Sequence, residues 1–125
     1  MKRIFVMMTM AFLIQACGGN STKSNDAKEE ITSDPVYQKG VALVGKNKCL
    51  TCHAINETIT GPPYAEIGKK YMNMPDTIVG HLARKIITGG NGVWGQIYMT
   101  PHPELSKEDA EAMVRYILLL GKKAK

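Results

Sequence analysis

Large aromatic side chains are scarce in this 125-residue chain, which contains one Trp and two Phe, and both Phe lie within the first 16 positions. Runs of five or six like charges are also missing, so we expect no nucleic-acid-binding arm despite a formal net charge of +5. The only long apolar run, at residues 4–14, is too short to span a bilayer comfortably. These absences and the length indicate one small domain and exclude a multi-span membrane protein.

The amino-terminal segment has the features of an export signal. A basic start at Lys2 and Arg3 and the apolar run precede a small residue and Cys17. Residues 14–17 (IQAC) resemble a bacterial lipobox, which implies that residues 1–16 are a lipoprotein signal peptide and that Cys17 is lipidated. An ordinary signal with an incidental cysteine is the alternative. We therefore predict an exported protein, periplasmic or on an extracytoplasmic face, anchored to a membrane through lipid on Cys17.

Residues 17–33 are predicted to form a flexible tether between the lipid and a folded domain. Ile31 is the only large apolar residue in this polar stretch. Such a segment cannot bury enough apolar surface to offset the entropy lost on ordering. The folded domain is therefore expected at residues 34–125.

The two remaining cysteines lie in the run Cys49-Leu50-Thr51-Cys52-His53. In an exported chain, C-x-x-C-H is the attachment signal for a c-type haem. Two thiols at this spacing can reach the two vinyl carbons on one edge of a porphyrin, and the histidine can bind the iron from one face. We therefore predict one covalent haem c, with its iron, at Cys49, Cys52 and His53.

Other uses of the two cysteines are less well supported. A thioredoxin-like C-x-x-C follows a strand and precedes a helix, whereas residues 46–48 are polar and residues 58–63 would break a long helix. A zinc site needs four ligands, and the sequence has no second C-x-x-C. A bare disulfide between cysteines this close would be strained. A thiol redox module nevertheless stays open as an alternative.

The group opposite His53 decides what the iron can do. A filled position limits the iron to electron transfer, and an open position permits substrate or gas binding. We predict Met99 as this ligand, because it lies in an irregular, glycine-rich stretch, residues 89–101, that can lie against a flat ring. His102 is the rival ligand. The methionines outside the signal other than Met99 are expected to fill the core or a turn: Met72, Met74 and Met113.

Helix-capping signals and apolar spacing predict a helical domain without strands. Gly40, in the interior of the first helix, is expected to permit close contact with another helix. Because the core has few aromatic residues, we expect the chain to fold poorly without its cofactor. The expected helices start at Pro35 after Asp34, span residues 64–71, run from an Asp76 N-cap to Thr88, and follow a Ser106 N-cap with an apolar stripe from Ala110 to Gly121.

From Val36 onward the chain resembles the short bacterial monohaem class I cytochromes c, which serve respiratory chains and in some organisms nitrite reductase. The resemblance rests on the haem-attachment run, the GPPY run at residues 61–64, the GVWG run at residues 92–95, and Met99. It implies an all-α class I cytochrome c fold, with three to five helices around one covalently attached haem and the first and last helices crossing near Gly40. One departure is Thr100, which separates Met99 from the proline that usually follows the ligand methionine directly.

The same resemblance implies roles for individual residues. Cys49 and Cys52 would form the thioether bonds, and His53 and Met99 would ligate the iron. The Pro62 carbonyl would bind the second nitrogen of His53. The haem propionates would accept hydrogen bonds from Trp94 and from Lys85 or Arg84, for which a core indole and solvated charges are the alternatives.

We therefore predict a one-electron carrier that exchanges electrons with a protein donor and a protein acceptor, and not an enzyme. No Ser-His-Asp set, paired carboxylates or phosphate-binding loop is present in the sequence. A haem enzyme or gas-sensing domain with an open sixth position is the main alternative. Four lysines could steer acidic redox partners weakly: Lys46, Lys48, Lys69 and Lys70.

Overall fold

A computed structural model of the chain describes residues 31–122. The predicted signal peptide, the lipidation site at Cys17 and most of the predicted tether lie outside the described residues. Residues 31–33 are helical, and the Asp34 amide donates to the Ile31 carbonyl at 3.3 Å. These three residues belong to the predicted tether, and a local hydrogen bond closes a turn there. The bounds of the tether and of the folded domain stay predictions. Within residues 31–122, no helix is both long and apolar enough to cross a membrane.

Helix α2 (Pro35–Lys46) begins where the sequence predicts. The Asp34 carboxylate accepts a hydrogen bond from the Val36 amide at 2.7 Å, and Pro35 occupies the first turn, where its missing N–H is not needed. At the other end, the backbone and side-chain amides of Asn47 both donate to the Leu43 carbonyl. The helix therefore ends just before the haem-attachment run.

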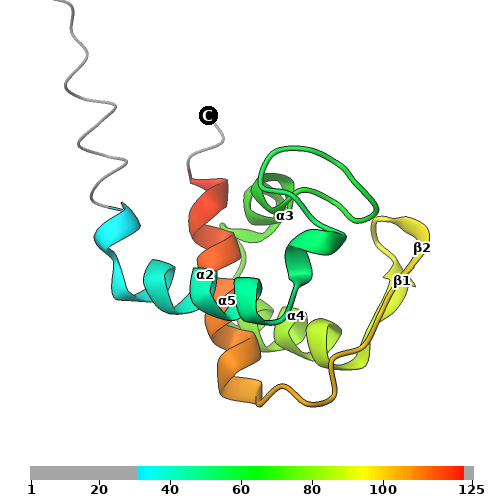
Figure 1. The fold of residues 1–125 in the computed structure, drawn as a ribbon. Helices are drawn as coiled ribbons and strands as arrows, with labels where there is room; N and C mark the ends of the chain where they lie inside the picture. Colours follow the sequence, from blue (N-terminus) through cyan, green and yellow to red (C-terminus); the bar gives the residue numbers. More distant parts are fainter. Residues whose placement is uncertain (1–30, 123–125) are drawn as a thin grey trace, which may run out of the picture.

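Helix α5 (Lys107–Gly121) packs against α2, α3 (Tyr64–Tyr71) and α4 (Thr77–Thr88) and forms the centre of the domain (Figure 1). The Ser106 side chain accepts a hydrogen bond from the Asp109 amide at 3.1 Å, which confirms the predicted cap. The apolar stripe of α5 is buried as expected. The largest fully buried side chains lie on α5 and α2: Tyr116, Met113, Val114 and Val44.

Two close helix contacts depend on glycine. A Cβ atom at Gly40 would lie 2.1 Å from Tyr116 Cβ, so the predicted close approach of α2 and α5 is confirmed. A Cβ atom at Gly121 would lie 2.2 Å from the Gly68 carbonyl carbon, so α3 and α5 meet backbone to backbone. No pattern in the sequence had indicated this second contact.

Helix α4 ends at Thr88 as predicted, but its first turn differs from the expectation. Asp76 precedes the helix, yet its side chain makes no capping hydrogen bond. Its backbone is already helical, and its carbonyl accepts from the Val79 amide at 3.0 Å. The turn is thus closed by backbone groups rather than by the carboxylate.

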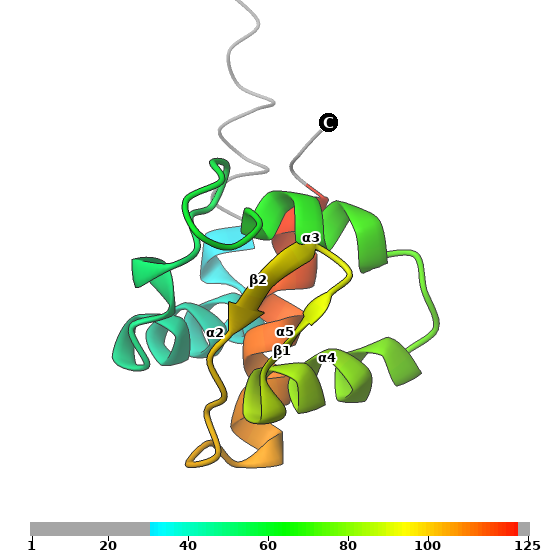
Figure 2. The same cartoon turned by 90° about the vertical axis from the view of Figure 1, so that its right-hand side faces the viewer.

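An antiparallel hairpin follows α4 and was not predicted. It consists of β1 (Gly90–Gly92) and β2 (Gly95–Met99), with Gly90 opposite Met99 and an irregularity between Gly90 and Gly92. Figure 2 shows the hairpin between α3 and α4, and Figure 1 places it at the opposite edge of the molecule from α2. Its residues lack an alternating apolar pattern because positions 91–98 are all exposed. The domain is otherwise helical over the described residues, so the predicted all-α class holds.

Candidate haem site

The haem-attachment run folds into a tight turn directly after α2. Lys48 adopts a left-handed backbone conformation (φ 55°), which is uncommon for a residue other than glycine. The 3₁₀ turn η1 (Cys49–Thr51) follows, and the Cys49 carbonyl accepts from the amides of Cys52 at 3.2 Å and His53 at 3.1 Å. Cys49 is half-buried, Cys52 is exposed, and no disulfide joins them. Both thiols and the imidazole are therefore positioned by one short segment.

The imidazole of His53 is fixed on several sides. Its Nδ1 lies 2.7 Å from the Pro62 carbonyl oxygen, and the residue is buried. Because a carbonyl oxygen only accepts, Nδ1 carries a proton, and in the neutral imidazole Nε2 then keeps its lone pair. The ring stacks on Tyr64 with 5.2 Å between centroids and 20° between planes. A Cβ atom at Gly61 would lie 2.5 Å from Cε1 of the same ring.

The loop that carries Gly61 and Pro62 is tied back to the attachment turn. The Gly61 amide donates to the Cys52 carbonyl at 2.7 Å, and the Thr60 amide donates to the same oxygen at 3.2 Å. These bonds bring the Pro62 carbonyl to the imidazole. The position of His53 is therefore determined by backbone groups close to it in sequence.

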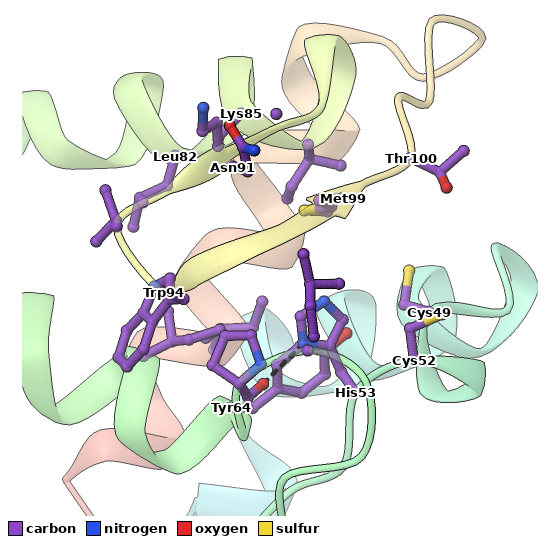
Figure 3. Close-up of a pocket in the computed structure, with 18 of the residues that line it drawn as sticks. Cys49, Cys52, His53, Tyr64, Leu82, Lys85, Asn91, Trp94, Met99 and Thr100 are labelled. Atoms are coloured by element: carbon purple, nitrogen blue, oxygen red, sulfur yellow. Dashed lines mark hydrogen bonds between the residues drawn. The ribbon is translucent and has the colours of Figure 1, made fainter.

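Met99 lies at the end of β2, half-buried against the core. Figure 3 shows it above His53, with the Cys49 and Cys52 sulfur atoms together at one side and Trp94 at the other. Beyond Thr100, the His102 amide donates to the carbonyls of Ile86 and Ile87, each at 3.1 Å. This contact ties the chain after Met99 to α4. The chain is held there even though Thr100 separates Met99 from Pro101.

All the predicted cofactor residues line one cavity of about 480 Å³. This volume is in the ordinary range for ligand pockets, roughly 300–1,000 Å³. Of the two cations expected near the propionates, Lys85 lines the cavity and Arg84 does not. His81 and His102 also line it. The predicted residues that meet here are Cys49, Cys52, His53, Pro62, Lys85, Trp94 and Met99.

The chemistry of the cavity suits a large apolar ring with iron at its centre. Its helical wall is formed by α3, α4 and α5 and is mostly apolar. An imidazole nitrogen and a thioether sulfur are established haem-iron ligands, and two free thiols stand at one side for covalent attachment. The residues present therefore fit a haem c. The apolar side chains include Leu82, Ile86, Met113, Val114 and Ile117.

Tyr64 is a site residue whose role the sequence did not indicate. Burial raises the pKa of the Cys49 thiol, and a hydrogen bond with the Tyr64 hydroxyl partly opposes this rise. Burial, and then the nearby Cys49, raise the pKa of Tyr64 itself. Both groups therefore stay protonated and neutral inside the cavity wall. The tyrosine directly after Pro62-Pro63 was visible in the sequence, but no local signal there identifies its contacts.

Comparison with known proteins identifies the family of the chain. A family model described as cytochrome c matches residues 37–121, more than half of the chain. The chain belongs to the cytochrome c family. As a member, it is a one-electron carrier with one covalently attached haem c and its iron, and the predicted fold and cofactor are confirmed.

Several small bacterial cytochromes are similar over about two thirds of the chain. Cytochrome c-552 of Nitrosomonas europaea is 40% identical over 83 residues, which cover 66% of this chain and 80% of that protein. Cytochrome c-551 of Azotobacter vinelandii is 37% identical over 81 residues, covering 65% of this chain and 96% of that one. The crystal structure of wild-type Nitrosomonas europaea cytochrome c552 matches with a TM-score of 0.60 over 64% of this chain and 98% of that chain.

Proposed function

We propose that the mature chain is an exported, lipid-anchored electron carrier whose haem c is attached through Cys49 and Cys52 and ligated by His53 and Met99. The observation that carries this proposal is the orientation of His53. Its Nδ1 is engaged by the Pro62 carbonyl at 2.7 Å, so Nε2 is the nitrogen left for a metal, in the cavity that Met99 also lines.

When bound, haem c supplies one reversible electron transfer at its iron. The residues of this chain hold that chemistry in place. The Pro62 carbonyl fixes the His53 tautomer and makes the imidazole a more basic ligand for a metal. Tyr64 and Gly61 restrict rotation of the ring, because one stacks on it and the other leaves no space beside it. A ligand that is fixed before electron transfer needs little rearrangement during it.

Met99 would supply a soft, neutral thioether ligand, which would favour the ferrous state of the iron relative to a second imidazole. An iron bound by both His53 and Met99 would have no position left for a substrate or a gas. This is why we propose an electron carrier that is not an enzyme. Lys85 and the Trp94 indole N–H, which both line the cavity, are proposed as donors to the haem propionates.

The proposed partners are a protein electron donor and a protein electron acceptor. Lys48, Lys69 and Lys70 are exposed around the cavity and α3, where positive charge would favour encounters with acidic surfaces. The proposed lipid anchor rests on the IQAC run at residues 14–17, because Cys17 lies outside the described residues. Two or more acyl chains on one cysteine would make the attachment stable.

Expression in a host competent for cytochrome maturation tests the cofactor and the anchor together. We expect the membrane fraction to give a reduced-minus-oxidised c-type spectrum, with pigment that acidified acetone does not extract from the protein. Cys17→Ala should move the coloured protein out of the membrane fraction and leave its spectrum unchanged. A colourless mature chain with two titratable thiols would instead support the thiol redox alternative.

The variant Met99→Ala tests the axial ligand. We expect wild-type protein to be low-spin in both oxidation states and not to bind carbon monoxide readily in the ferrous state. Met99→Ala should become high-spin when ferric and bind carbon monoxide when ferrous. The matched variant His102→Ala should keep the wild-type spectrum. If His102→Ala opens the position and Met99→Ala does not, His102 is the ligand; if the wild type is already high-spin, the enzyme or sensor alternative is correct.

A further inference from the structure

A lysine on α3 contacts the tryptophan at the turn of the hairpin. Lys70 Nζ lies 5.2 Å from the centroid of the Trp94 ring and 5.8 Å from that of Tyr71. An ammonium within about 6 Å of an aromatic centroid is attracted by the negative face of the ring. Among residues 31–122, no carboxylate forms an ion pair with Lys70. The described contacts of its charge are therefore the two aromatic rings.

The contact between Lys70 and Trp94 joins the hairpin to α3, and few other contacts connect these two elements. The hairpin makes few backbone contacts with the helices, and its residues 91–98 are exposed. Its base is held to α4 through Gly89 and His102, whereas its turn, Val93-Trp94, is next to α3 (Figure 2). Trp94 is 41% exposed, so burial of the indole contributes only part of what holds the turn.

The hairpin transmits the position of its turn to Met99. Met99 ends β2 and pairs with Gly90 at the base, while Gly92 pairs with Gly95 next to Trp94. Glycines 89, 90, 92 and 95 all have positive φ angles, and at two of them, Gly92 and Gly95, an added Cβ atom would have no neighbour within 4 Å. A segment this rich in glycine has little stiffness of its own. Contacts at its turn therefore limit the motion of the strand that carries Met99.

We propose that Lys70 is a positioning residue: its ammonium holds the Trp94 turn against α3 and thereby keeps Met99 at the cavity. This inference rests on the proposed ligation by Met99. The indole can serve both proposed roles, because Lys70 lies over the ring face while the N–H that would reach a propionate lies at the ring edge. Lysine suits this place better than a neutral residue because only a cation is drawn to the ring face.

Displacement of Met99 by added imidazole tests the proposal in the ferric holoprotein, at a pH where imidazole is neutral. Imidazole binds only when Met99 has left the iron, so its apparent affinity reports how easily the hairpin opens. We expect Lys70→Gln to increase this affinity about 2- to 5-fold, the effect of an exposed cation–π contact. Lys70→Arg should restore the wild-type affinity. The matched control Lys69→Gln removes the adjacent exposed charge and should leave it unchanged.

A second measurement follows the contact itself. Trp94 is the only Trp in the chain, so the ferrous protein has a single indole N–H resonance. We expect Lys70→Gln to shift this resonance and speed its hydrogen exchange, with Lys69→Gln and Lys70→Arg close to wild type. Global unfolding by urea should be almost the same in all three variants, which separates a local effect from a loss of stability.

The outcomes distinguish this inference from the proposed function. If Met99→Ala leaves imidazole affinity at the wild-type value, Met99 is not a ligand, and the proposed ligation and this inference both fail. If Met99→Ala raises the affinity strongly but Lys70→Gln does not, only the role of Lys70 is wrong. Equal changes in Lys70→Gln and Lys69→Gln would show a general effect of charge and would also overturn the role proposed for Lys70.

Discussion

The two sides of the cavity are built in different ways. On one side, His53 is fixed by the Pro62 carbonyl, the Tyr64 ring and the absence of a side chain at Gly61. On the other side, Met99 ends an exposed hairpin with several positive-φ glycines. The first side therefore depends on many short-range contacts and the second on a few contacts at the two ends of a hairpin. Changes that damage the first side should lower stability and alter the site together, whereas changes in the hairpin should alter the site alone.

The largest expected effect comes from breaking the helical framework of the His53 side with Gly121→Ala. The new methyl carbon would lie 2.2 Å from the Gly68 backbone, so α3, which carries Tyr64, must move away from α5. We expect the free energy of unfolding in urea to fall by about 3 kcal/mol. Gly45→Ala in α2 is the control, because no atom lies within 4 Å of its Cβ position. It should stabilise the protein by about 0.5–1 kcal/mol, and similar losses in both variants would contradict the backbone contact.

A smaller effect is expected from Gly61→Ala, which acts on His53 directly. A methyl carbon 2.5 Å from Cε1 must push the imidazole away from its place between Tyr64 and the loop. We expect a loss of about 1–3 kcal/mol in urea unfolding, with high-spin absorption in the ferric protein as His53 ligation weakens. Gly80→Ala, whose Cβ would meet only Glu111 Oε1 at 3.8 Å, should leave the absorption spectrum unchanged and stabilise the protein by about 0.5–1 kcal/mol, as expected for an uncrowded glycine inside a helix. A stable, spectrally normal Gly61→Ala protein would show that the imidazole is not tightly held.

The hairpin side is tested by Gly92→Ala. The φ angle of +111° at this position is unfavourable for alanine, although no atom crowds the new methyl group. The strain should cost about 1 kcal/mol and be relieved by opening the hairpin, so imidazole affinity should rise about 5-fold. Urea unfolding should change less than in Gly61→Ala. Gln96 is an exposed neighbour that does not line the cavity, so Gln96→Ala should bind imidazole like wild type. An equal rise in imidazole affinity in Gln96→Ala would show that the backbone conformation at Gly92 is not the cause.

The smallest expected effect concerns Tyr116 in the helical framework, whose ionisation should lower the free energy of unfolding at alkaline pH. Burial, and then the neighbouring Tyr37, raise the pKa of Tyr116 to about 12. The pKa of Tyr116 is higher in the folded state than the ordinary value of about 10. The contribution of the neutral Tyr116 to the free energy of unfolding is therefore complete below about pH 10 and is lost as the pH rises toward 12. We expect a loss of about 1 kcal/mol near pH 11 in urea titrations. Tyr116→Phe should flatten this part of the pH profile, and an unchanged slope would contradict it.

The helices and one half of the site could be predicted because their signals are local. Asp34 and Ser106 mark helix starts because their side chains accept hydrogen bonds from amides two and three residues later. The attachment run places two thiols and an imidazole within five consecutive positions. Asp76 shows the limit of such signals. Its residue type suits an N-cap, but backbone bonds close the turn instead.

The features that the sequence did not reveal depend on residues distant in the chain. The contact of Gly68 with Gly121 joins positions 53 residues apart. Gly121 alone is compatible with an ordinary helix end, and Gly68 alone does not show which helix approaches it. The hairpin was missed because backbone pairing, and not an apolar face, defines it. The contact of Lys70 with Trp94 joins a lysine typical of any exposed helix to a turn that was expected to be a loop.

Lys48 places a charged side chain where backbone conformation favours glycine. Its φ of 55° carries an energetic penalty of roughly 1 kcal/mol, and glycine would remove it. Its side chain lines the cavity immediately before Cys49, so glycine would also remove a positive charge from the approach to the redox centre. The most stable sequence for this turn and the sequence that keeps more positive charge beside the cavity are therefore different, and this chain has the second.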